Sequence, residues 1–310
     1  MLNILFSAKP AAWEEYRDHL TGAFEEAGLK ANLSRDHDPE TVDYIVFAPN
    51  GPVTDFAPYT KTKAVMSLWA GVETVVSNQT LTQPLLRMVD PGLTNGMVEW
   101  VVGHTMRHHL GMDDHIHGQD GVWRDTVYPP LAEQRPVTIL GIGALGAACG
   151  QALAQLGFPV TGWSRSPKTV EGVTCLSGED GLKEALTDAS IVILLLPKTP
   201  QTRDILNAET LDLLADGAFV INPGRGPLIN DDALLNALAT GKVRHATLDV
   251  FHVEPLPAEH PYWAHPNVTV TPHIASTTRP DSAAKVIAQQ ILRGEAGEPF
   301  LHVVDRQAGY

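Results

Sequence analysis

The segment that most constrains the fold is a glycine-rich turn, which lies between a strand and a helix in VTILGIGALGAACGQALAQLGFPVTGWSRS. Val137–Leu140 is an apolar run typical of a buried parallel strand. Gly141, Gly143 and Gly146 follow as a G-x-G-x-x-G motif that opens a helix. A strand, a glycine turn, a helix and a second strand in this order predict a doubly wound parallel sheet.

The three glycines have separate physical roles in such a unit. The first permits a tight turn, the second lets a pyrophosphate approach the backbone, and the third lets the helix pack closely on the strand. Ala144 and Leu145 begin the helix, where free N–H groups and the positive end of the helix dipole favour phosphates. We therefore expect a bound dinucleotide, and the alternative is a glycine turn without a ligand.

The end of the second strand distinguishes between dinucleotides. NAD sites place an acidic residue there to bind the ribose hydroxyls. This chain has no carboxylate at that point and instead has two hydroxyls and two cations, from Ser164, Arg165, Ser166 and Lys168. These groups suit a ribose 2′-phosphate. We predict that NADP(H) is preferred, with NAD(H) as an open alternative; the competing interpretation is a loop of solvated cations.

The rest of the chain alternates apolar runs with helical stretches, which predicts an α/β protein with parallel sheets. A chain of 310 residues favours two lobes. The first third has no glycine motif. Its expected strands are Asn3–Ser7, Tyr44–Ala48 and Ala64–Leu68, and its expected helix is Trp13–Ala27. The later expected strands are Ile191–Leu196, Ala218–Ile221, Ala246–Val250 and Val268–Thr271. The last expected helix is Ser282–Arg293.

Charge and cysteine content exclude several classes of protein. The chain has 22 basic and 36 acidic residues, a net charge of −14, which disfavours nucleic acid and anionic membrane as partners. Only Cys149 and Cys175 are present, so no disulfide framework is expected. The start, MLNILFSA, has the pattern of a strand and not of a signal peptide. We expect a cytoplasmic protein.

Three charged or titratable residues each follow an expected strand. Arg225 lies between two glycines in FVINPGRGPLIN, Glu254 lies in LDVFHVEP, and His273 lies in VTVTPHIAS. The carboxyl ends of strands border the ligand crevice of an open parallel sheet, so these side chains are expected there. Taken singly, each has an ordinary structural explanation: a braced turn, a solvated loop or an interior histidine.

Together with a nicotinamide, the three residues suit the reduction of a 2-keto acid. A guanidinium binds a carboxylate through two hydrogen bonds and polarises an adjacent carbonyl. An imidazole transfers the alcohol proton near neutral pH. A carboxylate beside the imidazole orients it and stabilises its protonated form. We therefore expect Arg225 to bind substrate, His273 to act as acid/base and Glu254 to support His273.

The motifs GIGALG, INPGRGPLIN, LDVFHVEPLP and TPHIAS occur in an order and spacing that resemble the D-isomer-specific 2-hydroxyacid dehydrogenase family. LLPKTPQT, SLWAGVE and the closing GEPFLHVVD also fit, so the resemblance covers essentially the whole chain. The short N-terminal region, GWSRSPK and the histidine motif most resemble its glyoxylate/hydroxypyruvate reductase A branch. NADPH-dependent reduction of glyoxylate or hydroxypyruvate is the implied activity.

The resemblance implies a fold of two lobes and further site residues. Residues 1–97 plus 277–310 would form a flavodoxin-like substrate domain, and residues 98–276 a Rossmann-type dinucleotide domain through which two copies dimerise. Backbone N–H groups of the loop that starts Trp69, Ala70, Gly71 would hold the substrate carboxylate. The nicotinamide side would be lined by Leu196, Pro197, Pro223, Gly224 and Asp249.

One position departs from the family pattern, and one segment suggests a different chemistry. Trp69 replaces a residue that is commonly small or polar, so its indole either narrows the substrate site or points into the core. HTMRHHLGMDDHIHGQD, residues 104–120, holds five histidines and suggests a metal. Its spacing lacks the tight pairing of structural zinc sites. We expect no metal and interpret the segment as a polar helix end and surface loop.

Two other functions stay open from the residues alone. The first is a non-catalytic dinucleotide sensor that acts as a corepressor, because such proteins can retain the Arg225, Glu254 and His273 set. The second is a dehydrogenase for a larger D-2-hydroxy acid or for 3-phosphoglycerate. The last of these needs extra cations for the phosphate and usually an added regulatory domain.

Overall fold

The computed structural model describes residues 1–123, 125 and 128–309. The chain forms two compact units: unit 1 comprises residues 1–93 and those from Thr277 onward, and unit 2 comprises Thr94–Ser276. The division at residue 93 falls inside helix α2 (Pro91–His109), four residues before the expected boundary at 97. The assignment of substrate to one unit and dinucleotide to the other stays a prediction.

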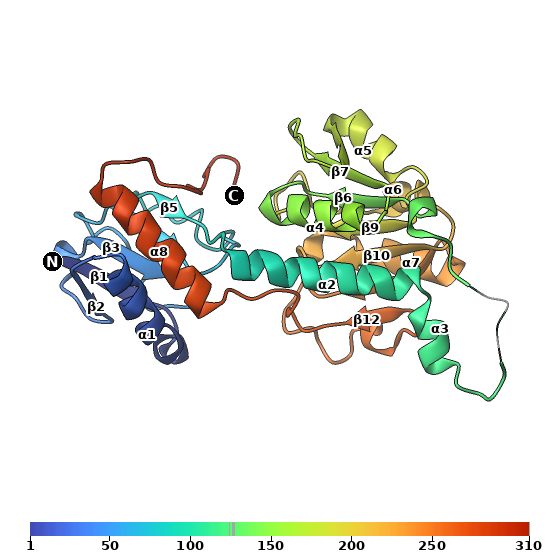
Figure 1. Ribbon diagram of the computed structural model, residues 1–310, viewed down its shortest axis with the longest axis horizontal. Helices are drawn as coiled ribbons and strands as arrows, with labels where there is room; N and C mark the ends of the chain where they lie inside the picture. Colours follow the sequence, from blue (N-terminus) through green and yellow to red (C-terminus); the bar gives the residue numbers. More distant parts are fainter. Residues whose placement is uncertain (124, 126–127, 310) are drawn as a thin grey trace. The chain divides into compact units, whose positions relative to one another are not determined.

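Within the described residues, unit 1 is built on a five-stranded parallel sheet with the order β2-β1-β3-β4-β5. This is the flavodoxin-like order. Helices α1 and α8 pack together on one face of the sheet (Figure 1), and loops cover the other face. The strands and helices of unit 1 are β1 (Leu2–Ser7), α1 (Pro10–Glu26), β2 (Ala31–Ser34), η1 (Pro39–Thr41), β3 (Tyr44–Phe47), β4 (Ala64–Ser67), β5 (Leu85–Leu86) and α8 (Pro280–Glu295).

The described part of unit 2 holds a seven-stranded parallel sheet with the order β12-β11-β10-β9-β6-β7-β8. The strand order reverses between β9 and β6, which is the point where ligands bind in such sheets. The Rossmann-type fold class is thereby confirmed. The strands are β6 (Val137–Leu140), β7 (Val160–Ser164), β8 (Val173–Ser177), β9 (Ile191–Leu194), β10 (Ala218–Asn222), β11 (Val243–Leu248) and β12 (Val268–Val270).

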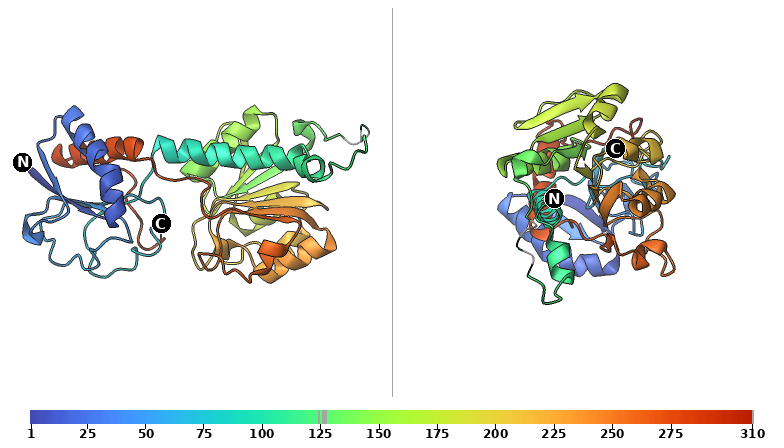
Figure 2. Two further views of the ribbon diagram at one scale, coloured as in Figure 1. Left: turned by 90° about the horizontal axis from the view of Figure 1, so that it is seen from below. Right: turned by 90° about the vertical axis from the view of Figure 1, so that its right-hand side faces the viewer.

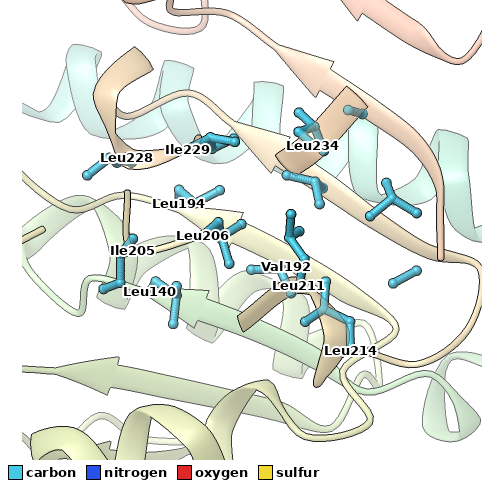
Figure 3. Close-up of a cluster of buried hydrophobic side chains, with 14 of the residues drawn as sticks. Leu140, Val192, Leu194, Ile205, Leu206, Leu211, Leu214, Leu228, Ile229 and Leu234 are labelled. Atoms are coloured by element: carbon cyan, nitrogen blue, oxygen red, sulfur yellow. The ribbon is translucent and has the colours of Figure 1, made fainter. Parts of the chain in front are cut away.

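Helices cover both faces of this sheet, so its central strands are buried throughout (Figure 2). Helices α2 and α4 pack on one face. Helices α5, α6 and α7 pack on the other, over the leucine-rich cluster around Val192 and Leu211 (Figure 3). After α2, the described helical segments of unit 2, including those just named, are α3 (Met112–His117), η2 (Ala132–Gln134), α4 (Ala144–Gln155), α5 (Gly178–Leu186), α6 (Ala208–Asp212), η3 (Gly226–Leu228), α7 (Asp231–Thr240) and η4 (Pro261–Ala264).

The sequence pattern missed three strands, β2, β5 and β8. The β2 and β8 strands lie at the edges of their sheets and are only partly buried, so their sequences mix polar and apolar residues. The two-residue β5 is too short to give a pattern. No helix among the described residues is long and apolar enough to cross a membrane.

Candidate active site

Three neighbouring strands of the unit 2 sheet end in loops that carry the predicted catalytic residues. Arg225 follows β10, Glu254 follows β11 and His273 follows β12. These strands are adjacent and parallel, so the three loops leave the same edge of the sheet. This edge is the carboxyl end, where α/β proteins bind their ligands.

The structure brings His273 and Glu254 into direct contact. Nδ1 of His273 lies 2.7 Å from Oε2 of Glu254, and because an ionised carboxylate only accepts hydrogen bonds, Nδ1 is the donor. The other oxygen of Glu254 accepts the N–H of Phe251 at 2.9 Å. The His273 side chain is 51% exposed, and its Nε2 makes no hydrogen bond with a described residue. That nitrogen is available to a ligand.

The backbone holds His273 in an unusual conformation. Its φ of +54° lies in the left-handed region, which costs free energy for a residue other than glycine. The N–H of His273 donates to the carbonyl of Asp249 at 2.8 Å and lies 3.0 Å from that of Thr271. These contacts fix where the imidazole leaves the chain.

Asp249 organises the loop that carries His273. Its carboxylate is fully buried, at 0% exposed. One oxygen accepts from Oγ1 of Thr271 at 2.6 Å and the N–H of Ile274 at 2.9 Å, and the other accepts the N–H of Ala275 at 2.9 Å. Three hydrogen bonds compensate for burial of the charge. We did not predict this loop-holding contact from the sequence; the predicted place of Asp249 beside a nicotinamide stays a prediction.

The Arg225 loop is closed by its own polar groups. The side chain of Asn222 donates to the Arg225 carbonyl at 3.0 Å and accepts the N–H of Gly224 at 3.1 Å. Gly226 is required because a Cβ at this position would lie 2.0 Å from the carbonyl carbon of Phe251. The loop of Arg225 therefore packs directly on the loop that carries Glu254.

The glycine motif fits a dinucleotide pyrophosphate. Gly146 packs so closely that a Cβ would lie 1.9 Å from the carbonyl oxygen of Gly141, whereas a Cβ on Gly143 would meet nothing within 4 Å. Open space thus faces Gly143, the N-cap of α4. The first turn of α4 has neither a side-chain cap nor an acidic residue. Its N–H groups, including those of Ala144 and Leu145, are suited to phosphate oxygens.

The residues predicted to bind the 2′-phosphate lie together at the end of β7 and directly after it. Ser164 is half-buried, and its hydroxyl donates to the carbonyl of Ser166 at 2.7 Å. Arg165, Ser166 and Lys168 are exposed. The segment presents two cations and two hydroxyls at the carboxyl edge of the sheet.

The loops after β9 and β10 carry the residues expected at the nicotinamide side. Leu196 is buried, and the carbonyl of Pro197 accepts Oγ1 of Thr202 at 2.7 Å. Pro223 and Gly224 follow β10, which pairs with β9. These residues therefore lie near the point where the strand order reverses.

The Trp69 loop belongs to unit 1 and follows β4. The Trp69 indole is 42% exposed, so the interpretation that it points into the core is wrong. The backbone N–H of Trp69 donates to Oγ of Ser67 at 3.0 Å, and the backbone carbonyl of Trp69 accepts the N–H of Met88 at 3.1 Å. The N–H groups of Ala70 and Gly71 donate to no other residue that the structure describes. They are therefore available to an anion.

The histidine-rich segment differs from our interpretation. His108 and His109 are buried, at 3% and 6% exposed, so the description as a polar surface is wrong for them. Nε2 of His108 lies 2.8 Å from Oγ1 of Thr247, and its ring stacks on Phe219 at 4.7 Å. Burial lowers the pKa of His108 to about 2. Over the described residues, no group of three or more His, Cys, Asp or Glu is arranged to hold a metal.

Comparison with known proteins identifies the family. Residues 100–275 match the model of the D-isomer specific 2-hydroxyacid dehydrogenase NAD binding domain. Glyoxylate/hydroxypyruvate reductase A of Serratia proteamaculans is 38% identical, with 100% of both chains covered. The corresponding protein of Salmonella heidelberg is 40% identical over 80% of this chain and 82% of its own.

Solved structures give the same result. A D-isomer specific 2-hydroxyacid dehydrogenase from Xanthobacter autotrophicus Py2, in complex with NADPH and MES, superimposes with a TM-score of 0.92 at 40% identity and 99% coverage of both chains. The NADPH-dependent glyoxylate/hydroxypyruvate reductase of Sinorhizobium meliloti, in complex with NADP and sulfate, gives 0.88 at 34% identity and 100% coverage of both. The chain therefore belongs to the D-isomer-specific 2-hydroxyacid dehydrogenase family.

Proposed function

We propose that this protein reduces glyoxylate, hydroxypyruvate or both to the 2-hydroxy acid, with NADPH as the hydride donor. The observation that carries the proposal is the 2.7 Å hydrogen bond between Glu254 and His273. It orients an imidazole, with Nε2 open, at the carboxyl edge of a dinucleotide-binding sheet. The names of the relatives supply the substrate class.

His273 supplies the proton in the proposed reaction. When bound, NADPH supplies a hydride to the carbonyl carbon of the keto acid. Nε2 of His273 donates a proton to the carbonyl oxygen, and the carboxylate of Glu254 stabilises the imidazolium that precedes this transfer. Arg225 binds the substrate carboxylate and polarises the carbonyl. Asp249 holds the His273 loop in register for the transfer.

The cofactor is proposed to bind through unit 2. The N–H groups of Gly143, Ala144, Leu145 and Gly146 would hold the pyrophosphate, because open space faces this turn. The 2′-phosphate would lie against four residues at the end of β7 and directly after it: Ser164, Arg165, Ser166 and Lys168. Leu196, Pro197, Pro223, Gly224 and Asp249 would line the nicotinamide side.

Unit 1 is proposed to bind the substrate. The N–H groups of Ala70 and Gly71, which donate to no other described residue, would donate hydrogen bonds to its carboxylate. The exposed indole of Trp69 would limit the substrate to small keto acids.

We further propose that the protein is a cytoplasmic homodimer assembled through unit 2. In the described part of residues 112–131, several large apolar side chains are exposed, which is unusual for a monomer surface. They are Met112, Ile116, Val122, Trp123, Tyr128 and Leu131. Light scattering of the purified protein tests the proposal by measuring its molar mass in solution. The wild type should be a dimer and Ile116→Glu should weaken the dimer, whereas a monomeric wild type would contradict the proposal.

A panel of keto acids tests the function. We expect NADPH oxidation with glyoxylate and hydroxypyruvate, weaker rates with bulkier keto acids, and a lower kcat/KM with NADH. If no small keto acid is reduced while the dinucleotide still binds, the sensor function is favoured and the reductase is excluded. Faster turnover of a large keto acid would instead identify a dehydrogenase for a longer substrate.

A further inference from the structure

Arg87 lies at the carboxyl end of the unit 1 sheet, directly after β5. Strands β4 and β5 pair in parallel with Met66 opposite Leu86, so Ser67 and Arg87 are the next residues along. On the other side of β5, the N–H of Arg87 donates to the carbonyl of His302 at 3.1 Å. Both flanks of Arg87 are therefore fixed by backbone neighbours.

The register of β5 determines the face on which Arg87 lies. Side chains alternate along a strand, so Arg87 shares the face of Leu85. Leu85 packs in one cluster with Val72 and Val75, which belong to the loop that follows β4. The same loop carries the free N–H groups of Ala70–Gly71. Arg87 is therefore on the face of the sheet over which this loop folds.

The charge of Arg87 has no partner within the part of the chain that the structure describes. Its guanidinium makes no hydrogen bond or ion pair there, although the chain has 36 acidic residues and only 22 basic ones. Partial burial lowers the pKa of Arg87, and desolvation is the cause. Holding an unpaired cation away from water costs free energy. An anionic ligand would recover that cost.

We propose that Arg87 is a second cationic substrate-binding residue, which holds the carboxylate of the 2-keto acid together with the N–H groups of Ala70 and Gly71. This inference rests on the proposed function. A guanidinium and two N–H groups supply enough donors for both carboxylate oxygens.

Arg87→Gln tests the proposal, because it removes the charge and keeps a polar side chain. Arg35→Gln is the matched control: Arg35 follows β2, at the opposite edge of the same sheet, and is exposed. In Arg87→Gln we expect the KM for glyoxylate to rise about tenfold or more. The kcat and the Kd for NADPH should change much less. Arg87→Lys should recover part of the lost affinity, and Arg35→Gln should match the wild type.

Binding of oxamate, an unreactive analogue of a 2-keto acid, gives a readout that does not need turnover. We expect oxamate to raise the Tm of the NADPH-loaded wild type and of Arg35→Gln, and to have little effect on Arg87→Gln. Without ligands, Arg87→Gln should be at least as stable as the wild type. Equal oxamate shifts in all three proteins, no shift in the wild type, or a lower Tm of ligand-free Arg87→Gln would each overturn the proposal.

The two readouts separate this proposal from the proposed function. A wild type that binds oxamate through Arg87 but reduces no keto acid would refute the reductase and support the anion site. A wild type that reduces glyoxylate with a KM unaffected by Arg87→Gln would support the reductase and refute the role of Arg87.

Discussion

Oε2 of Glu254 accepts a hydrogen bond from Nδ1 of His273 at 2.7 Å, while Oε1 of the same carboxylate is bound by the N–H of Phe251. Glu254 is thus fixed by its own loop before it orients the imidazole. The tautomer that leaves Nε2 free is set by this contact. The relationship supports the proposal that His273 is the acid/base and that Glu254 acts through it.

His273→Ala should abolish proton transfer and leave the fold intact, because the imidazole is half exposed and contributes little to packing. We expect kcat to fall by about 10²- to 10⁴-fold, measured by NADPH oxidation. Glu254→Gln should lower kcat less, because it keeps the imidazole and removes only the charge. If His273→Ala retained wild-type kcat, another residue would have to be the acid.

Arg225→Ala should raise the KM for the keto acid and lower kcat, because the guanidinium is proposed to bind both carboxylate and carbonyl. We expect a fall in kcat/KM that corresponds to a loss of about 2–4 kcal/mol in transition-state binding. The affinity for NADPH should stay nearly unchanged. Arg203→Ala, which removes an exposed arginine of the same unit, is the control. An unaltered kcat/KM in Arg225→Ala would remove Arg225 from the site.

Arg165→Ala should weaken the binding of NADPH more than the binding of NADH, because only NADPH carries the 2′-phosphate. A charge-assisted hydrogen bond predicts an increase in Kd of about 10- to 100-fold for NADPH. Fluorescence titration of the wild type and the variant with each dinucleotide measures the change in Kd for NADPH and for NADH. Equal effects on the two cofactors would mean that Arg165 does not recognise the phosphate.

His108 should make the protein less stable in acid. Its ordinary pKa of 6.5 is lowered by burial to about 2 in the folded state. The unfolded chain therefore binds a proton as pH falls below 6.5, and the folded chain does not until near pH 2. The free energy of unfolding then falls by about 1.4 kcal/mol per pH unit across this window.

Denaturant unfolding at pH 7 and pH 5 measures the effect. His108→Gln should reduce the difference in stability between the two pH values by about 2 kcal/mol. His115→Gln, which removes an exposed imidazole from α3, should leave it unchanged. The same loss of stability in the wild type and in His108→Gln would show that other groups cause the acid sensitivity.

The sequence predicted the buried part of the fold because buried strands have the clearest hydrophobic pattern. Central strands such as Val137–Leu140 are covered on both faces, and continuous apolar runs follow from that burial. Helix α8 begins two residues earlier than expected, at Pro280, because proline suits the first turn of a helix. The partly buried edge strands Ala31–Ser34 and Val173–Ser177 mix polar and apolar residues, so the sequence did not predict them.

The site was predictable only where chemistry is carried by residue type. A histidine and a glutamate after neighbouring strands indicated a catalytic pair, and the structure brings His273 and Glu254 together. The loop contacts of Asp249 were not predictable, because they depend on one hydroxyl and two backbone N–H groups more than twenty residues away in the chain. Hydropathy also could not show that His108 is buried, since its partner Thr247 comes from a distant strand.

The most direct test of the proposed reaction is transfer of deuterium from NADPH labelled at C4 of the nicotinamide. With the label on the transferred position and glyoxylate as substrate, mass spectrometry should find glycolate one mass unit heavier than the unlabelled product. His273→Ala should give almost no deuterated glycolate in the same time. Glycolate without deuterium, or no glycolate from the wild-type protein, would contradict hydride transfer at this site.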